Sequence, residues 1–116
     1  MCDHSNADEI SSLFKTIKKE QGGLDVLVNN CFGAVEDIFT STEKKFWEKG
    51  AGWWDKMNNV GLRAHFIASQ YAVPLLMEKA TAERPGLIVT LSSFGGSFPI
   101  FDVAYGVGKA AKDRMV

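Results

Sequence analysis

The first segment of the chain has the apolar spacing of a helix. Ser5 or Asn6 is a suitable N-cap, because the side-chain oxygen of either residue can accept a hydrogen bond from the first helical turn. Gly22 and Gly23 predict the end of this helix. The apolar positions that we expect on its buried face are Ile10, Leu13, Phe14 and Ile17.

Two short apolar runs, at 24–28 and 87–91, predict buried parallel strands. Residues 31–52 lie after the first run and have no clean period, so they predict a loop with short helical pieces around 42–49. A long helix is expected from Trp53 or Trp54, and Pro74 should bend or shorten it. A last helix is expected from Ala104 onward. The apolar positions expected along the long helix are Met57, Phe66, Ile67, Val73, Leu75 and Leu76.

The order of these segments predicts one α/β domain over residues 1–116. Helix, strand, helix, strand and helix alternate, which is typical of a parallel sheet with helices on both faces. Two strands are visible, and the first residues would suit a strand stub. So thin a sheet indicates the central βαβα portion of a Rossmann-type, doubly wound fold, without its first strands and its C-terminal part.

Composition and charge exclude several classes of function. Thirteen basic and fourteen acidic residues give a net charge of -1 with no basic stripe, so nothing predicts nucleic-acid binding. No apolar run predicts a transmembrane segment. Cys2 and Cys31 are expected to be free thiols in a reducing compartment, since neither belongs to a Cys-x-x-Cys pair. His4 and His65 are too isolated to predict a metal site.

Candidate chemistry gathers where the predicted strands end. Ligands of open parallel sheets bind beyond the carboxyl ends of the strands, and here those ends are the polar pairs 29–30 and 92–93. Tyr105 and Lys109 are four residues apart and share one face of the last helix. A phenol beside an ammonium suits proton transfer, because a nearby cation favours the phenolate.

Three segments together resemble the middle of a short-chain dehydrogenase/reductase: 24–30 (LDVLVNN), 87–93 (LIVTLSS) and 105–110 (YGVGKA). The resemblance covers nearly the whole chain and implies a partial NAD(P)-binding Rossmann domain. It implies an oxidoreductase that moves a hydride between a nicotinamide cofactor, NAD or NADP, and a small carbonyl or alcohol substrate. It also implies an intracellular protein, either cytoplasmic or associated with the endoplasmic reticulum.

The resemblance assigns catalytic roles by position. Tyr105 matches the general acid/base, and Lys109 matches the lysine that binds the nicotinamide ribose and tunes the tyrosine. Ser93 matches the serine that orients the substrate, although Ser92 remains the alternative because it has the commoner spacing to the tyrosine. Counting without gaps places Gly61 where the family has a proton-relay asparagine. Asn59 is the nearest candidate for that role, provided that the helix shifts or bulges.

Other positions match cofactor contacts. Asn30 corresponds to the asparagine beside the adenosine ribose, and Asn29 to its sheet-stabilising neighbour. Asp3 and His4 correspond to residues that contact the adenine, with a solvated terminus as the alternative reading of Asp3.

The chain also departs from the family pattern. The residues after the two asparagines are Cys31 and Phe32, with a glycine only at 33, and no Gly-rich phosphate-binding turn precedes residue 3. We therefore expect an internal fragment of a longer protein. The competing hypothesis is a catalytically inactive interaction module. The resemblance implies a dimer surface on the long middle helix and the Tyr105 helix, through which the chain would form a homodimer or pair with a full-length paralogue.

Overall fold

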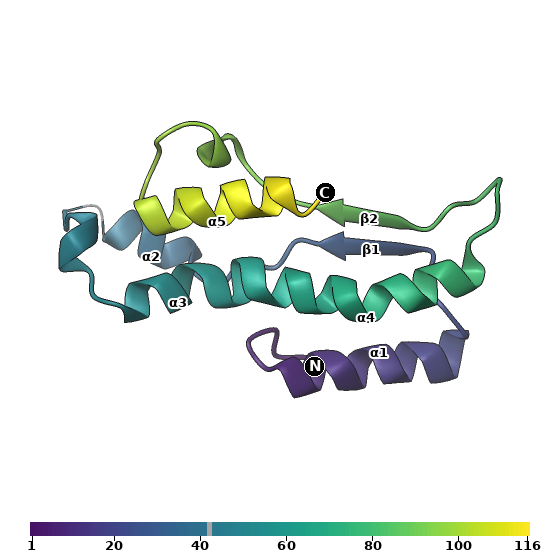
Figure 1. Ribbon diagram of the computed structural model, residues 1–116. Helices are drawn as coiled ribbons and strands as arrows, with labels where there is room; N and C mark the ends of the chain where they lie inside the picture. Colours follow the sequence, from purple (N-terminus) through teal and green to yellow (C-terminus); the bar gives the residue numbers. More distant parts are fainter. Residues whose placement is uncertain (42) are drawn as a thin grey trace.

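The computed structural model describes residues 1–41 and 43–116, and its helices and strands alternate in the predicted order (Figure 1). The α/β fold class is therefore confirmed. The elements are α1 (Ala7–Gln21), β1 (Val26–Asn29), α2 (Val35–Thr40), η1 (Phe46–Glu48), α3 (Gly52–Asn58), η2 (Asn59–Arg63), α4 (Ala64–Lys79), β2 (Leu87–Thr90), η3 (Phe94–Gly96) and α5 (Val103–Arg114).

Local signals set both ends of α1. The Asn6 side chain accepts a hydrogen bond from the backbone N–H of Asp8 at 3.0 Å, so Asn6 is the N-cap. Gly22 has φ of 74°, a left-handed conformation that glycine adopts without steric cost, and its N–H donates to the Lys18 carbonyl. The sequence therefore predicted this helix correctly.

The two strands pair in parallel, with Val26 opposite Leu87 and Asn29 opposite Thr90. Leu27 and Ile88 face α1 and α4, where they pack against the larger apolar core. The opposite face of the sheet is open. Among the described residues, the expectation of helices on both faces of the sheet is therefore wrong. The expectation that both strands are buried is wrong for the same reason. The exposed side chains of that face are Val26, Val28, Leu87, Val89 and Leu91. The expected strand stub is also absent, since residues 1–3 have no regular structure.

Two apolar clusters form the core. The larger one lies between α1 and α4 and consists of Ile10, Phe14, Ala64, Ala68, Ala72, Leu75 and Leu76. The smaller one lies near the first turn of α5 and consists of Ala34, Ile38, Met57, Ala104 and Tyr105. Leu13, Phe66 and Val73 were expected to be buried, but they are 38%, 53% and 42% exposed. Tyr105 is thus anchored in a core cluster.

The long middle helix is continuous but irregular. It starts at Gly52, close to the predicted position, and passes through the π-helical segment η2 before α4. A π-turn adds a residue to the turn and so shifts which side chains face a neighbouring helix. Pro74 does not end the helix, which continues to Lys79. No helix in the described part of the chain is long and apolar enough to cross a membrane.

The described residues between β1 and α3 contain more helix than the sequence predicted. Helix α2 was not predicted, whereas η1 lies within the region where short helical pieces were expected. Thr42, which belongs to that expectation, lies outside the described residues.

Candidate functional site

The candidate site lies at the edge of the sheet where both strands end. Asn30 follows β1, Ser92 and Ser93 follow β2, and α5 begins beside them. The carboxylate of Asp102 caps α5 by accepting a hydrogen bond from the Ala104 N–H at 2.8 Å. This cap fixes the start of the helix, in whose first turn Tyr105 lies.

Ser93 and Tyr105 are in direct contact. The Oγ atom of Ser93 lies 2.8 Å from the phenol oxygen of Tyr105, and either group can be the donor. The Gly95 N–H also donates to this Oγ, at 3.1 Å. A Cβ atom at Gly95 would lie 2.6 Å from the Tyr105 ring, so the loop approaches the ring this closely because residue 95 is glycine.

Ser92 faces the backbone of α5 instead. Its hydroxyl donates to the carbonyl oxygen of Lys109 at 3.2 Å. In the reverse direction, the ammonium of Lys112 donates to the carbonyl oxygen of Leu91 at 3.2 Å. Lys112 is 2% exposed, and burial together with the Lys109 ammonium lowers the pKa of Lys112 to about 8. These two bonds join the end of β2 to α5.

Lys109 is buried next to Tyr105, with 9% of its surface exposed. Its Nζ lies 5.3 Å from the centroid of the Tyr105 ring and 5.1 Å from that of Phe32. Both side chains open onto a cavity of about 280 Å³, which could receive a small ligand. The cavity is lined by Asn30, Phe32, Val35, Ile38, Phe39, Leu91, Ser92, Phe101, Tyr105 and Lys109.

Asn29 and His65 tie the end of β1 to α4. The Asn29 amide donates to Ser69 Oγ of α4 at 3.0 Å. The Nε2 atom of His65 pairs with the carbonyl oxygen of Cys31 at 2.9 Å. Burial and the nearby Lys112 ammonium lower the pKa of His65 to about 4. Because a carbonyl oxygen can only accept a hydrogen bond, Nε2 is the ring nitrogen that carries the hydrogen and donates it.

A buried ion pair connects the loop before α3 to the cap of α5. The Lys49 ammonium lies 2.9 Å from the Asp102 carboxylate, and the two side chains are 6% and 4% exposed. The indole N–H of Trp53 donates to the same carboxylate at 3.0 Å. Burial would raise the pKa of Asp102, but the hydrogen bonds from Lys49, Trp53 and the Ala104 N–H hold it below its ordinary value.

The first residues of the chain do not line this cavity. The Asp3 carboxylate accepts hydrogen bonds from both the N–H and the hydroxyl of Ser5 at 2.8 Å, and these bonds lower the pKa of Asp3. Asp3 is exposed, and His4 follows it in the turn before α1. Asp3 is thus held in a turn, although the structure does not bring it to the Tyr105 cavity.

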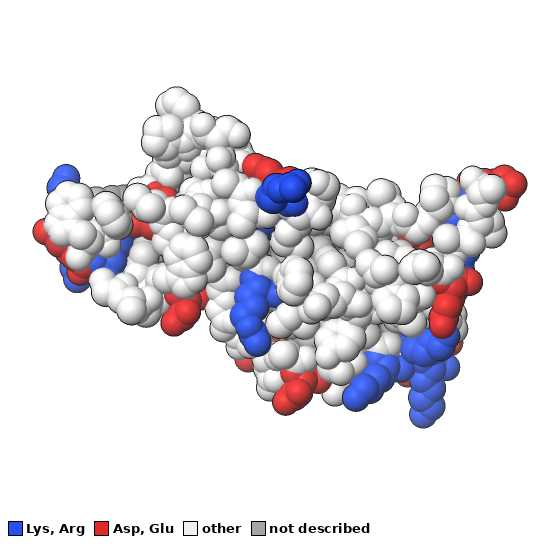
Figure 2. All heavy atoms as spheres, viewed as in Figure 1, with Lys and Arg blue, Asp and Glu red and all other residues white. Residues whose placement is uncertain are grey.

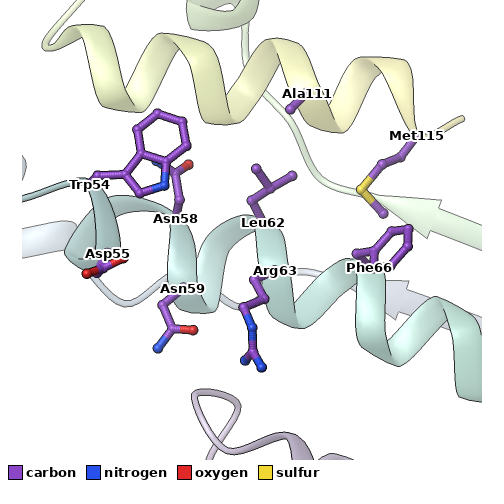
Figure 3. A pocket seen from close by; sticks show the side chains of 9 residues that line it. All are labelled: Trp54, Asp55, Asn58, Asn59, Leu62, Arg63, Phe66, Ala111 and Met115. Carbon is purple, nitrogen blue, oxygen red and sulfur yellow. The ribbon is translucent and has the colours of Figure 1, made fainter.

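Asn59 also lies apart from Tyr105. It lines a second cavity, of about 360 Å³, and its side chain points away from α5 in Figure 3. The neighbouring Asn58 points toward α5, and its amide donates to the Ala104 carbonyl at 3.2 Å. The structure therefore unites Ser93, Tyr105 and Lys109 and leaves Asn59 outside.

Three features of the site were not singled out from the sequence. These are the burial of Lys112, the Lys49–Asp102 ion pair and the contact of Phe32 with Lys109. The position of Asp102 just before a predicted helix could have indicated that its carboxylate is held at the start of that helix, since aspartate is a favoured N-cap. In the described part of the chain, no three His, Cys, Asp or Glu side chains are grouped to hold a metal ion.

The amino-acid sequence of this chain is similar to those of known proteins. The family described as "Enoyl-(Acyl carrier protein) reductase" matches residues 1–116. The mouse protein "Dehydrogenase/reductase SDR family member 1" is 48% identical over 116 residues, which are 99% of this chain and 36% of the mouse protein. The chain thus spans about a third of the length of this curated relative.

Solved structures with the same fold include nucleotide complexes. An enoyl-(acyl-carrier-protein) reductase from Anaplasma phagocytophilum, in complex with NAD, has a TM-score of 0.80 and 23% identity, over 99% of this chain and 41% of that one. A metagenomic short-chain oxidoreductase in complex with NADP has a TM-score of 0.77 and 24% identity, over 98% and 48% of the two chains. At these identities the likeness shows the fold alone.

Proposed function

This chain belongs to the short-chain dehydrogenase/reductase family, and on that premise we propose that it provides the proton-transfer half of a nicotinamide-dependent oxidoreductase site. The observation that carries the proposal is the 2.8 Å contact of Ser93 with Tyr105, next to the buried ammonium of Lys109. The proposed substrate is a small molecule with a carbonyl or an alcohol group.

In the proposed reaction, Tyr105 exchanges a proton with the substrate oxygen. For reduction the phenol donates its proton to the carbonyl oxygen, and for oxidation the phenolate accepts the hydroxyl proton. The Ser93 hydroxyl donates a second hydrogen bond to the same oxygen and orients it. The Lys109 ammonium stabilises negative charge on the phenolate.

The residues around the cavity suit a nicotinamide cofactor. Lys109 and Asn30 both line the cavity and carry N–H donors, which suit the hydroxyl groups of a ribose. A bound NAD or NADP would supply or accept the hydride. We also propose that Asp3 and His4 contact the adenine of the cofactor. The support for this proposal is their position in the sequence resemblance. We do not include Asn59 in the proposed proton path, because its side chain points away from α5.

Direct titration tests this proposal. The chain is titrated separately with NADH and NADPH, and binding is followed by tryptophan fluorescence. We expect saturable binding of one cofactor, weakened at least about tenfold in Lys109→Met by loss of the ammonium donor. Lys15→Met, at an exposed position on α1, is the matched control and should bind as the unchanged chain does. A folded chain that binds neither nucleotide would contradict the proposal.

A second proposed function, homodimerisation, is favoured by the outer surface of α3, α4 and α5. The 360 Å³ cavity between these helices is lined by the apolar residues Trp54, Leu62, Phe66, Ala111 and Met115 and by the polar residues Asp55, Asn58, Asn59 and Arg63. Phe66 and Met115 point toward one another across it (Figure 3). Figure 2 shows mainly uncharged atoms over the middle of this side of the molecule, interrupted by basic side chains, with most of the other charged side chains toward the lower edge and the two ends. Apolar patches of this kind are typical of protein interfaces.

Sedimentation analysis tests the dimer. We expect a concentration-dependent dimer, and Phe66→Glu should shift it to monomer because a carboxylate cannot be buried unpaired at an apolar contact. Phe46→Glu, at another exposed aromatic residue on η1, should leave the dimer intact. A chain that stays monomeric at all concentrations would exclude the interaction module.

We further propose an intracellular location, cytoplasmic or at the endoplasmic reticulum, because Cys2 and Cys31 are unpaired.

A further inference from the structure

Phe32 contacts both members of the Tyr105–Lys109 pair. Its ring lies 6.0 Å from the Tyr105 ring, centroid to centroid, with 81° between the planes. The Lys109 Nζ is 5.1 Å from the centroid of the Phe32 ring, within the range of a cation–π interaction. The same Nζ is 5.3 Å from the centroid of the Tyr105 ring, so the ammonium lies beside two aromatic side chains.

The Phe32 ring occupies space that exists because position 61 is glycine. Gly61 lies in η2, and a Cβ atom built on it would be 2.6 Å from Cδ2 and 3.0 Å from Cε2 of Phe32. Real Cβ atoms do not approach a ring so closely, so any larger residue would displace it. Gly61 is also buried. The side chain of Phe32 and the missing side chain of Gly61 are therefore complementary in shape.

We propose that Phe32 is a positioning residue, which holds the Lys109 ammonium beside Tyr105, and that Gly61 provides the room for its ring. A lysine side chain has a flexible four-carbon stem, so its ammonium needs external contacts to stay in one place. The ring supplies such a contact without the negative charge of a carboxylate, which would neutralise the ammonium. The consequence for catalysis rests on the proposed function, whereas the packing itself can be tested without turnover.

The first test reads the position of Lys109 by NMR. Protein is prepared with ¹³C-labelled lysine, and the ε-methylene signal of Lys109 is assigned through Lys109→Arg. We expect ring currents of Phe32 to move this signal upfield, and we expect Phe32→Leu to remove most of that shift. Phe32→Tyr keeps the aromatic face and should restore it. Phe101→Leu is the matched control, because the Phe101 ring contacts the Tyr105 ring edge to face, with 5.3 Å between the centroids and 85° between the planes.

The second test measures the fit between Phe32 and Gly61. At an unobstructed helical position, replacing glycine by alanine raises the stability of the fold. A steric conflict between the new methyl group and the Phe32 ring should lower the stability instead. We expect Gly61→Ala to lower the urea midpoint of the unchanged protein and to raise it in the Phe32→Ala background. Equal changes in the two backgrounds would show that the residues do not interact.

These measurements separate the inference from the proposed enzyme activity. A Lys109 signal that is unchanged in Phe32→Leu overturns the positioning role, whatever the cofactor titration shows. If Phe32→Leu does not fold, the same signal is read in Gly61→Ala, where the displaced ring must move it. A chain that binds no nucleotide but shows the Phe32-dependent shift would retain the inference and lose the enzyme proposal.

Discussion

The side-chain hydroxyl of Ser92 donates a hydrogen bond to the main-chain carbonyl of Lys109, with 3.2 Å between the two oxygens. Ser93, the next residue, reaches the phenol of Tyr105 instead. The sequence left open which serine acts on the substrate. The structure directs one hydroxyl to the helix backbone and the other to the candidate acid/base.

The two serines should therefore respond differently to removal of the hydroxyl. Ser92→Ala should lower the free energy of unfolding by about 1 kcal/mol, because one partly buried hydrogen bond is lost. Ser93→Ala should lower turnover by the proposed site about 10²-fold, at the lower end of positioned acid/base effects. Urea titration and a carbonyl-reduction assay measure the two quantities. The opposite result, with turnover lost in Ser92→Ala and kept in Ser93→Ala, would reverse the assignment.

The charge of Asp102 should stabilise the fold. Asp102→Asn leaves the buried Lys49 ammonium without its counter-ion, which typically costs about 3 kcal/mol of unfolding free energy. The pKa of Asp102 is lowered in the folded state, so its stabilisation is present above the ordinary value of 3.8 and is lost as the pH falls below it. Urea titrations from pH 3 to 7 should show a smaller acid loss in Asp102→Asn. The exposed Glu83, changed to Gln, is the control and should keep the native slope.

His65 should make the protein sensitive to mild acid. Its pKa falls from 6.5 to about 4 on folding, mainly through burial, so the unfolded chain binds more protons between these values. Stability should be full above pH 6.5 and should decline by roughly 3 kcal/mol as the pH approaches 4. His65→Gln should flatten this decline. His4→Gln, at the only other histidine, should not, and a decline that persists in His65→Gln would assign it to another group.

Gly108 should not tolerate a side chain. A Cβ atom there would lie 2.1 Å from the Asn58 amide oxygen, so Gly108→Ala would push Asn58 away from the Ala104 carbonyl. We expect a loss of about 1–3 kcal/mol in unfolding free energy, although alanine favours helices. Gly52→Ala in α3 meets no atom within 4 Å and should be neutral or stabilising. Similar urea midpoints for the two variants would contradict this packing.

Much of the fold could be predicted because its signals are local. Asn6 and Gly22 carry the chemistry of helix caps, and α1 begins and ends where they stand. The two strands were predicted from short apolar runs, but a run of apolar residues does not reveal how many faces of a sheet are covered. Val28 and Val89 look like core residues in the sequence, yet they are 56% and 38% exposed.

The candidate site was predictable where a motif carries it and not where packing decides. Ser93, Tyr105 and Lys109 followed from the family resemblance, and the structure brings them together. Asn58, the last residue of α3, faces α5, whereas Asn59, where the π-helical segment begins, does not, and no local signal in the sequence distinguishes the two asparagines. Lysines are rarely buried, so nothing in the sequence indicated that Lys112 is 2% exposed.

The parallel pairing of β1 with β2 determines where the ends of any additional strands would lie relative to this site. Each strand has one main-chain edge that is not paired within the described sheet. The two strands run parallel, with Asn29 opposite Thr90. Any further parallel strand added at either edge would end on the same side as Asn29 and Thr90. Its following loop would therefore project toward Ser93 and Asn30. The architecture is modular: new contacts for a ligand can be added from both flanks while the Tyr105 helix keeps its place.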